Sequence, residues 1–138
     1  MCRIVGVISL DGKRINEDNF IAMRDTMTPG GPDSEGVWLN ESRTVALGHR
    51  RLSILDVSNA GNQPMHSASN RYVISYNGEV YNFKEIRADL ETLGHVFNSD
   101  CDTEVILAAF DQYGMDCVSR FLGMFAIAIW DKKLKVIS

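Results

Sequence analysis

Two stretches in the second half of the chain constrain its fold most, because both carry apolar residues at helical spacing. The apolar positions are Phe83, Ile86, Leu90 and Leu93 in the first stretch and Val105, Ile106, Ala109, Phe110 and Tyr113 in the second. Residues with this spacing lie along one side of a helix, so each helix must cover an apolar surface elsewhere in the protein.

The residues around these stretches indicate where the two helices begin and end. Asn82 followed by Glu85 resembles a capping box, in which two side chains bind free N–H groups at a helix start. Gly94 and Gly114 come directly after the last apolar positions, where glycine commonly ends a helix. We therefore expect helices from Asn82 to Leu93 and over 103–113.

Strand-like runs on both sides of these helices supply the surface that they need. Short runs rich in β-branched and other apolar residues occupy 3–10, 36–39, 44–49 and 72–76. The chain finishes with an apolar hairpin over 124–138. Strands at both ends with helices between them predict an α+β domain, in which helices pack on a largely antiparallel sheet.

A further helix is expected near the start of the chain, over 16–27. Phe20, Met23 and Met27 recur there at helical spacing, and the Pro-Gly-Gly-Pro segment over 29–32 cannot continue the helix.

Two other segments are expected to be irregular. The stretch over 56–69 is rich in Ser, Asn, Gly and Pro and is typical of a long surface loop, which is usually functional or disordered. Asn77-Gly78 is expected to end the strand over 72–76, because this pair favours a tight turn.

Composition bounds the size of the protein and argues against two classes of partner. With 138 residues, 45% of them hydrophobic, the chain is one compact domain or part of one. Its net charge of −4 argues against nucleic-acid binding, because nothing offsets phosphate repulsion. No apolar run approaches the ~18–20 residues of a bilayer span, and the first residues do not show the charged-then-apolar pattern expected of a signal sequence. We expect neither a nucleic-acid nor a membrane partner.

The cysteines and histidines limit the chemistry further. The three cysteines have no paired spacing, which favours a reducing cytoplasm over a disulfide framework. His49, His66 and His95 lie far apart and form no known ligand pattern, so no metal site is predicted.

Cys2, directly behind Met1, is open to two interpretations. Free cysteine is among the most buried residue types, so an inert side chain at a strand edge is the commoner case. Removal of Met1, which a small second residue permits, places a thiol and a free α-amine on one residue. An α-amine, with a reference pKa of about 7.7–8.0, can serve as the base for the nucleophile beside it.

Three other positions carry weaker signals of the same kind. Asn77-Gly78 offers a side-chain amide and an unobstructed N–H to an oxyanion, although a hairpin turn is its commoner use. Arg51 is a planar cation that suits a carboxylate, or else a solvated surface residue. Asp102 stands at a predicted helix start, where it binds an ammonium group or caps the helix. A ligand with both a carboxylate and an ammonium group would be a free amino acid.

Seven segments that follow one another along the chain carry a family resemblance. They are MCRIVGVIS, GGPDSEGVW, LGHRRLSILD, GNQPM, SYNGEVYNFKEIRADLETLGHVF, SDCDTEVILAAFDQYG and FLGMFAIAIWD. In this order they resemble the glutaminase domain of class II glutamine amidotransferases of the asparagine synthetase type. The resemblance implies the N-terminal nucleophile hydrolase fold, an αββα sandwich of antiparallel sheets, incomplete here at its C-terminus. Residues 1–138 would then be a partial glutaminase domain without the synthetase domain.

The resemblance also implies a role for each candidate residue. Cys2 would attack the side-chain amide of glutamine, and Asn77 with Gly78 would form the oxyanion hole. The residues implied to bind glutamine are Arg51 at the α-carboxylate, Asp102 at the α-ammonium, Asn77, Gly78, Glu79, and the backbone of Leu52, Ser53, Ile54 and Leu55. Glutamine would be hydrolysed through a thioester to glutamate and ammonia.

The expected cofactors and partners come from the same resemblance. This domain would need no cofactor, because ATP and magnesium belong to the synthetase domain that uses the ammonia in full-length relatives. Cytoplasmic location and a homodimer are expected.

Three departures from the family pattern leave another interpretation open. Arg3 follows the nucleophile where a small residue is usual, and a cation there can crowd the site or favour the thiolate. Gly30 stands where the family commonly has Arg, and the chain stops at Ser138, which predicts exposed edges and an incomplete core. The alternative function is a truncated, catalytically silent homologue that serves as an interaction module. A third interpretation is that the chain belongs to a sister branch of the family, with a phosphoribosyl or sugar-phosphate acceptor.

Overall fold

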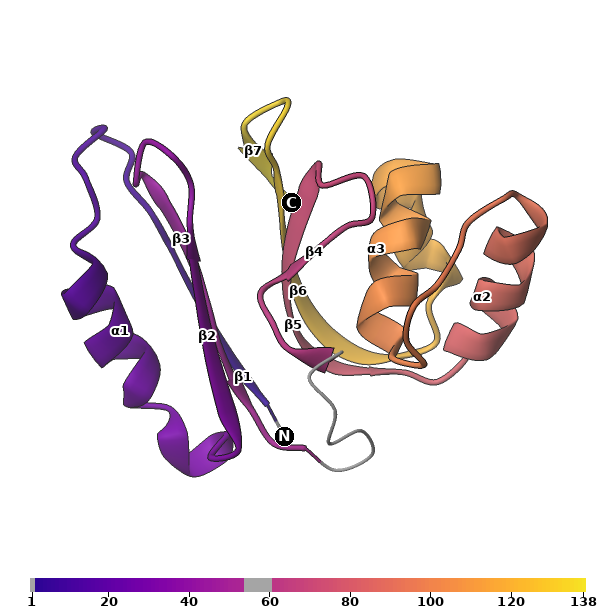
Figure 1. Ribbon diagram of the computed structural model, residues 1–138, viewed down its shortest axis with the longest axis horizontal. Coiled ribbons are helices and arrows are strands. Elements are labelled where there is room, and N and C mark those ends of the chain that lie inside the picture. Colours follow the sequence, from indigo (N-terminus) through magenta and orange to yellow (C-terminus); the bar gives the residue numbers. More distant parts are fainter. Residues whose placement is uncertain (1, 54–60) are drawn as a thin grey trace.

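The computed structural model describes residues 2–53 and 61–138 and places them in four layers (Figure 1). Helix α1 (Glu17–Asp25) covers one sheet, a second sheet faces the first, and α2 (Phe83–Thr92) and α3 (Asp102–Tyr113) cover the far side of the second. The layers therefore follow the αββα order that the family resemblance implies.

All strand pairs in both sheets are antiparallel. The first sheet has the order β1-β3-β2 and the second the order β4-β5-β6-β7. The strands are β1 (Arg3–Ile8), β2 (Ser34–Leu39), β3 (Val45–Arg51), β4 (Met65–His66), β5 (Tyr72–Val80), β6 (Gly123–Asp131) and β7 (Val136–Ile137). Two 3₁₀ helices complete the described elements, η1 (Thr28–Gly30) and η3 (Gly114–Arg120).

Strand β3 contacts both neighbouring layers, because successive side chains of a strand point to opposite faces. Val45 and Leu47 pack against Val73 of the second sheet, whereas Gly48 faces Phe20 of α1. All seven residues of β3 are buried. The strand runs two residues beyond the expected 44–49 and so carries Arg51 into the interior.

The larger core lies between the second sheet and its two helices. Tyr72, Ile74 and Tyr76 of β5 contribute to it, together with residues of α2 and α3 such as Leu90 and Ile106. The predicted apolar stripes account for this packing, with Ile86 and Leu90 buried in α2 and most of the α3 stripe buried. Both helices are followed by the expected glycine with positive φ.

The expected turn at Asn77-Gly78 is wrong, because β5 continues through both residues to Val80. Gly78 pairs with Phe125 of β6, and a Cβ on Gly78 would lie only 2.2 Å from the Met124 carbonyl oxygen. Glycine is required here because two strands approach closely.

The capping box expected at Asn82 is also wrong. The Asn82 side chain makes no cap hydrogen bond to α2. Its Nδ2 instead donates to the Arg120 carbonyl, and its Oδ1 accepts from the Leu122 N–H, both at 2.9 Å. Asn82 therefore ties the start of α2 to the segment before β6.

Two further expectations, the helix over 16–27 and the loop over 56–69, are confirmed in part. Helix α1 forms with Asn16 as its cap, but it ends at Asp25, before the expected Met27. Of the other two expected apolar residues, Phe20 is buried and Met23 is exposed. The described part of the expected loop over 56–69 contains the short strand β4, which pairs with β5.

Candidate active site

Cys2 lies at the end of the first sheet, on the face directed toward the second sheet. Side chains two residues apart in a strand share a face, so Cys2 and Ile4 point the same way. Ile4 pairs with His49, whose ring forms a hydrogen bond to the second sheet. The Cys2 sulfur lies 3.7 Å from the Leu52 carbonyl oxygen, within range of a weak S–H hydrogen bond. The thiol is thus partly buried beside the segment that the family resemblance assigns to glutamine binding.

Arg3 points away from the thiol, because alternation along β1 sends it to the opposite face. A Cβ on Gly30 would lie 2.4 Å from Arg3 Nε and 2.9 Å from Arg3 Cγ, so the arginine stem covers this glycine. The two departures from the family pattern therefore occupy one space on the α1 side of the sheet. The expectation that Arg3 can crowd Cys2 is therefore wrong, because the Arg3 side chain packs against Gly30 instead.

Arg51 is buried rather than solvated, with 9% of its surface exposed. Its Nη1 donates to Asn62 Oδ1 at 3.2 Å, and a Cβ on Gly61 would lie 2.6 Å from its Nη2. The surface interpretation of Arg51 is therefore wrong. Its guanidinium faces the segment that begins at Gly61, at the same end of the sandwich as Cys2.

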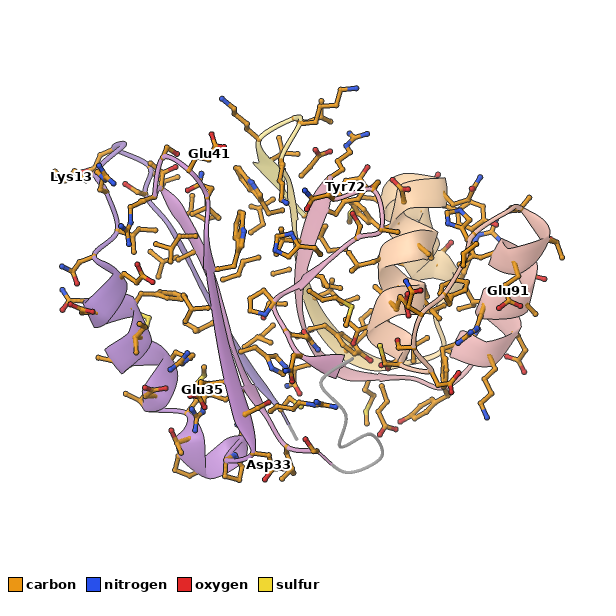
Figure 2. All side chains as sticks on the ribbon, in the orientation of Figure 1. Lys13, Asp33, Glu35, Glu41, Tyr72 and Glu91 are labelled. Atoms are coloured by element: carbon orange, nitrogen blue, oxygen red, sulfur yellow. The ribbon has the colours of Figure 1, made fainter. Side chains whose placement is uncertain are left out.

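Asp33, which sequence reasoning gave no role, fixes the backbone next to Arg51. Its Oδ2 accepts the Ser53 N–H at 2.6 Å, and its own N–H donates to the Arg51 carbonyl at 2.9 Å. The segment before it packs so closely that a Cβ on Gly31 would meet the Arg50 backbone. Figure 2 shows Asp33 at the lower end of the first sheet. The only sequence signal was its place in the GGPD segment.

Asn77, Gly78 and Glu79 lie within β5 and not at its end. Side chains alternate between the two faces of a strand, so Asn77 lies on the same face of β5 as Ser75. The Ser75 hydroxyl donates to the Gly48 carbonyl of the first sheet at 3.0 Å, so this face is directed toward the first sheet. Asn77 Oδ1 is buried and has no hydrogen-bond partner among the described residues. This oxygen is an acceptor, so it is suited to a ligand group that donates a hydrogen bond, since unmade hydrogen bonds are costly. Glu79 is exposed.

Asp102 is the first residue of α3, but it does not cap that helix. Its Oδ2 accepts the Tyr76 hydroxyl at 2.7 Å and the Val80 N–H at 3.3 Å, both from β5. The capping interpretation is therefore wrong. The carboxylate is held against the strand that carries Asn77 and Gly78.

Asn62 and Gln63 connect the Arg51 side of the site to the Asp102 side. Asn62 accepts a hydrogen bond from Arg51. The next residue, Gln63, accepts the Tyr76 N–H at its Oε1 at 2.6 Å, and its Nε2 donates to Thr103 Oγ1 at 3.4 Å. Thr103 directly follows Asp102. The GNQPM segment carries part of the family resemblance, but no role was predicted for Asn62 or Gln63. Ile54 and Leu55, which were also expected at the site, lie outside the described residues, and so does Met1, whose removal was expected.

His49 is a buried neutral link between the two sheets. Its Nε2 donates to the Tyr76 carbonyl at 3.1 Å, and only 1% of its surface is exposed. Burial, aided by the charge of Arg51, lowers the pKa of His49 to about 4. The ring therefore stays uncharged at neutral pH.

This burial predicts a pH-dependent stability. An unfolded chain protonates His49 near pH 6.5 and the folded chain only near pH 4, so the unfolded state binds more protons between these values. The free energy of unfolding should lose about 2–3 kcal/mol from this residue between pH 7.5 and 4.5. Urea unfolding at both pH values measures it, with His49→Gln as the control. An equal loss of unfolding free energy in the parent chain and in His49→Gln would contradict the assignment of this pH dependence to His49.

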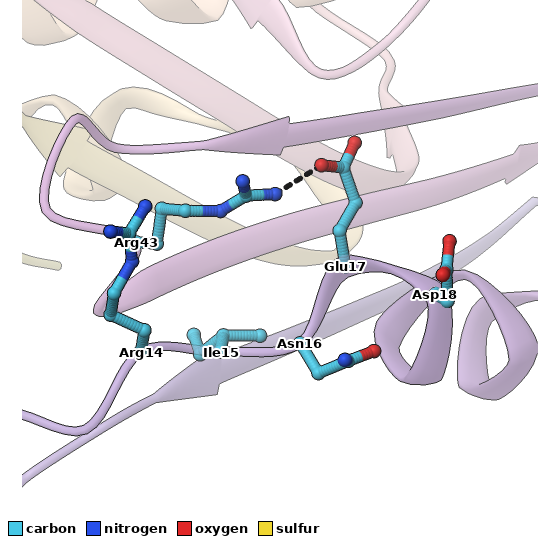
Figure 3. Close-up of a pocket in the computed structure, with 6 residues that line it drawn as sticks. All are labelled: Arg14, Ile15, Asn16, Glu17, Asp18 and Arg43. Atoms are coloured by element: carbon cyan, nitrogen blue, oxygen red, sulfur yellow. Dashed lines mark hydrogen bonds and ion pairs between the residues drawn. The ribbon is translucent and has the colours of Figure 1, made fainter.

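Two surface hollows of the first sheet lie away from this site. They have volumes of about 450 and 470 Å³ and share Arg14, Glu17 and Arg43 in their walls. Figure 3 shows Arg43 paired with Glu17. They lie near the turn between β2 and β3, at the opposite end of the sheet from Asp33.

The described ranges, 2–53 and 61–138, contain no group of three or more His, Cys, Asp or Glu side chains that could hold a metal ion. No helix in those ranges is long and apolar enough to cross a membrane.

Comparison with known proteins gives a consistent result. A model of the glutamine amidotransferase domain matches residues 1–138. Asparagine synthetase [glutamine-hydrolyzing] 1 of Bacillus subtilis is 42% identical over 135 residues, which cover 96% of this chain and 21% of that protein. Asparagine synthetase [glutamine-hydrolyzing] 3 of the same organism is 38% identical, with 96% and 22% covered. The chain thus spans about a fifth of the length of these relatives.

A solved structure is similar in fold. It is the glutamine phosphoribosylpyrophosphate amidotransferase of Bacillus subtilis, complexed with ADP and GMP. The TM-score is 0.54 at 24% identity, and the match covers 64% of this chain and 21% of that one. At this identity the match concerns the fold alone, and it confirms the expected sandwich of antiparallel sheets.

Proposed function

The chain belongs to the glutamine amidotransferase domain family, and we propose that it hydrolyses glutamine to glutamate and ammonia through a thioester on Cys2. The observation that carries the proposal is the position of the Cys2 thiol, 3.7 Å from the carbonyl of Leu52, the residue directly after the buried Arg51. A nucleophile thereby lies close to a cation that suits the α-carboxylate of an amino acid.

The proposed reaction has two halves. In the first, the α-amine of Cys2 takes the thiol proton and the sulfur attacks the side-chain carbonyl carbon of glutamine. Asn77 and Gly78 donate to the oxyanion, and the ammonium proton passes to the leaving amide nitrogen, which departs as ammonia. In the second half, the amine activates water, which attacks the thioester and releases glutamate and the Cys2 thiol.

Binding of glutamine is proposed to use the two charged sides of the site. Arg51 and the backbone of Leu52–Leu55 hold the α-carboxylate, Asp102 holds the α-ammonium group, and Glu79 contributes at the rim. Asp33 supports this arrangement, because it fixes the Ser53 N–H and the Arg51 carbonyl.

The ammonia is proposed to supply an ATP- and magnesium-dependent, amide-forming synthetase domain, in keeping with the asparagine synthetases that the chain resembles. The glutaminase reaction itself is proposed to need no cofactor and to take place in the cytoplasm. We propose a homodimer as the assembly.

A glutamate-release assay tests the proposal, provided that intact mass first shows whether Met1 is absent. The matched control carries one extra lysine between Met1 and Cys2, so that the initiator is retained and the α-amine no longer belongs to cysteine. The unmodified chain should release glutamate, and the extended chain should lose at least about 100-fold in rate, the size of a typical acid–base contribution. Folded chain without Met1 that releases no glutamate would instead support the silent interaction module.

A further inference from the structure

The Tyr76 hydroxyl makes the shortest contact to Asp102 in the site. It donates to Asp102 Oδ2 at 2.7 Å, and the Val80 N–H reaches the same oxygen at 3.3 Å. In the described part of the chain no hydrogen bond reaches the second oxygen, Oδ1. One side of the carboxylate is therefore fixed by β5, and the other is left to accept a hydrogen bond.

Tyr76 is itself held rigidly. Its N–H donates to Gln63 Oε1 at 2.6 Å, its carbonyl accepts from His49, and its ring is 3% exposed in the larger core. Burial, and then the hydrogen bond to Asp102, raise the pKa of Tyr76 far above its usual value. The hydroxyl therefore keeps its proton and always acts as a donor.

A neutral donor on one oxygen has a specific consequence for ligand binding. It fixes the orientation of the carboxylate without neutralising its charge, so the carboxylate stays attractive to a cation. An arginine or lysine in the same place would compete with an incoming ammonium group.

We propose that Tyr76 is a positioning and specificity-determining residue: it orients Asp102 so that Oδ1 receives the α-ammonium group of glutamine. This inference rests on the proposed function, because it assigns the ammonium group to Asp102. It extends that function to Tyr76, which lies directly before Asn77-Gly78 in the SYNGEVYNF segment and to which the family resemblance assigned no role.

The test compares glutamine with 4-carbamoylbutanoate, which is glutamine without the α-amino group. Tyr76→Phe should raise KM for glutamine about 10-fold, equivalent to one lost hydrogen bond to a charged group, and leave kcat within about twofold. The kcat/KM for the amine-free analogue should stay within about twofold. Discrimination between the two substrates should therefore fall about tenfold.

Tyr72→Phe is the matched control. Tyr72 lies on the same face of β5, is 5% exposed, and packs its ring edge-on against Phe110, away from Asp102. Loss of its hydroxyl should change neither KM nor discrimination. Thermal melting of both variants shows whether each is folded.

The outcomes separate the inference from the proposed function. Equal losses for both substrates in Tyr76→Phe would overturn the inference in favour of a purely structural role, and so would an unchanged KM for glutamine. If the parent chain hydrolyses neither substrate, the proposed function fails. Binding of L-glutamate and glutarate by calorimetry then decides on Tyr76 without turnover, with a selective loss for glutamate supporting the inference and an unselective loss, or no binding, overturning it.

Discussion

Replacing Cys2 by alanine should abolish glutamate release, with a loss of at least about 10³-fold in kcat. The reason is that the proposed thioester cannot form without the sulfur, and the remaining groups can only bind glutamine and polarise its amide. The affinity for glutamine should change little, because Arg51 and Asp102 remain. Steady-state rates measure the first effect, and calorimetric titration of the inactive variant measures the second.

Cys101→Ala is the control for this substitution. Both cysteines are free and partly buried, but the Cys101 sulfur contacts the Ser99 hydroxyl at 3.0 Å rather than the Leu52 backbone. This variant should keep the parent rate. Equal glutamate release by Cys2→Ala and the parent chain would remove Cys2 from the reaction.

Gly78→Ala should strongly damage the fold of the site. A Cβ there would lie 2.2 Å from the Met124 carbonyl oxygen and 2.5 Å from Phe125 Cα, at a φ of +148° that alanine rarely adopts. Backbone atoms cannot move aside as a side-chain end can. The free energy of unfolding should fall by about 2–4 kcal/mol, as urea denaturation can measure. Glutamate release should be lost with it, because Gly78 is proposed to donate to the oxyanion.

Gly94→Ala separates backbone strain from steric overlap. Gly94 has a φ of +95°, but a Cβ there would meet nothing within 4 Å. It should therefore cost only about 1 kcal/mol and leave the activity intact. A Gly78→Ala protein as stable as Gly94→Ala would contradict the close approach of β5 and β6.

The elements that the sequence predicted well are those whose signals are local. The apolar stripe of α3 and the glycine that follows it lie within a dozen residues, and both are confirmed. The Asn77-Gly78 turn and the Asn82 capping box failed for the opposite reason. In each case a partner about 40 to 50 residues away, in or just before β6, overrides a local preference.

The same distinction applies to the site. Family resemblance pointed to Cys2, Arg51 and Asp102 as site residues. Composition and spacing alone favoured an inert buried cysteine, a solvated surface arginine and a helix cap. Asp33 and Tyr76 were missed because their partners are 20 and 26 residues away, and no local pattern records such contacts. The direction of Arg3 was predictable, since alternation in a strand directs it away from Cys2.

The most direct test of the account is the mass of the chain during turnover. The chain is mixed with glutamine, quenched in acid, and digested under acidic conditions that preserve thioesters. The account predicts an N-terminal peptide that lacks Met1 and carries one glutamyl group on Cys2, and no such group in Cys2→Ala. Glutamate release by a chain that retains Met1, or a glutamyl group on any residue other than Cys2, would contradict it.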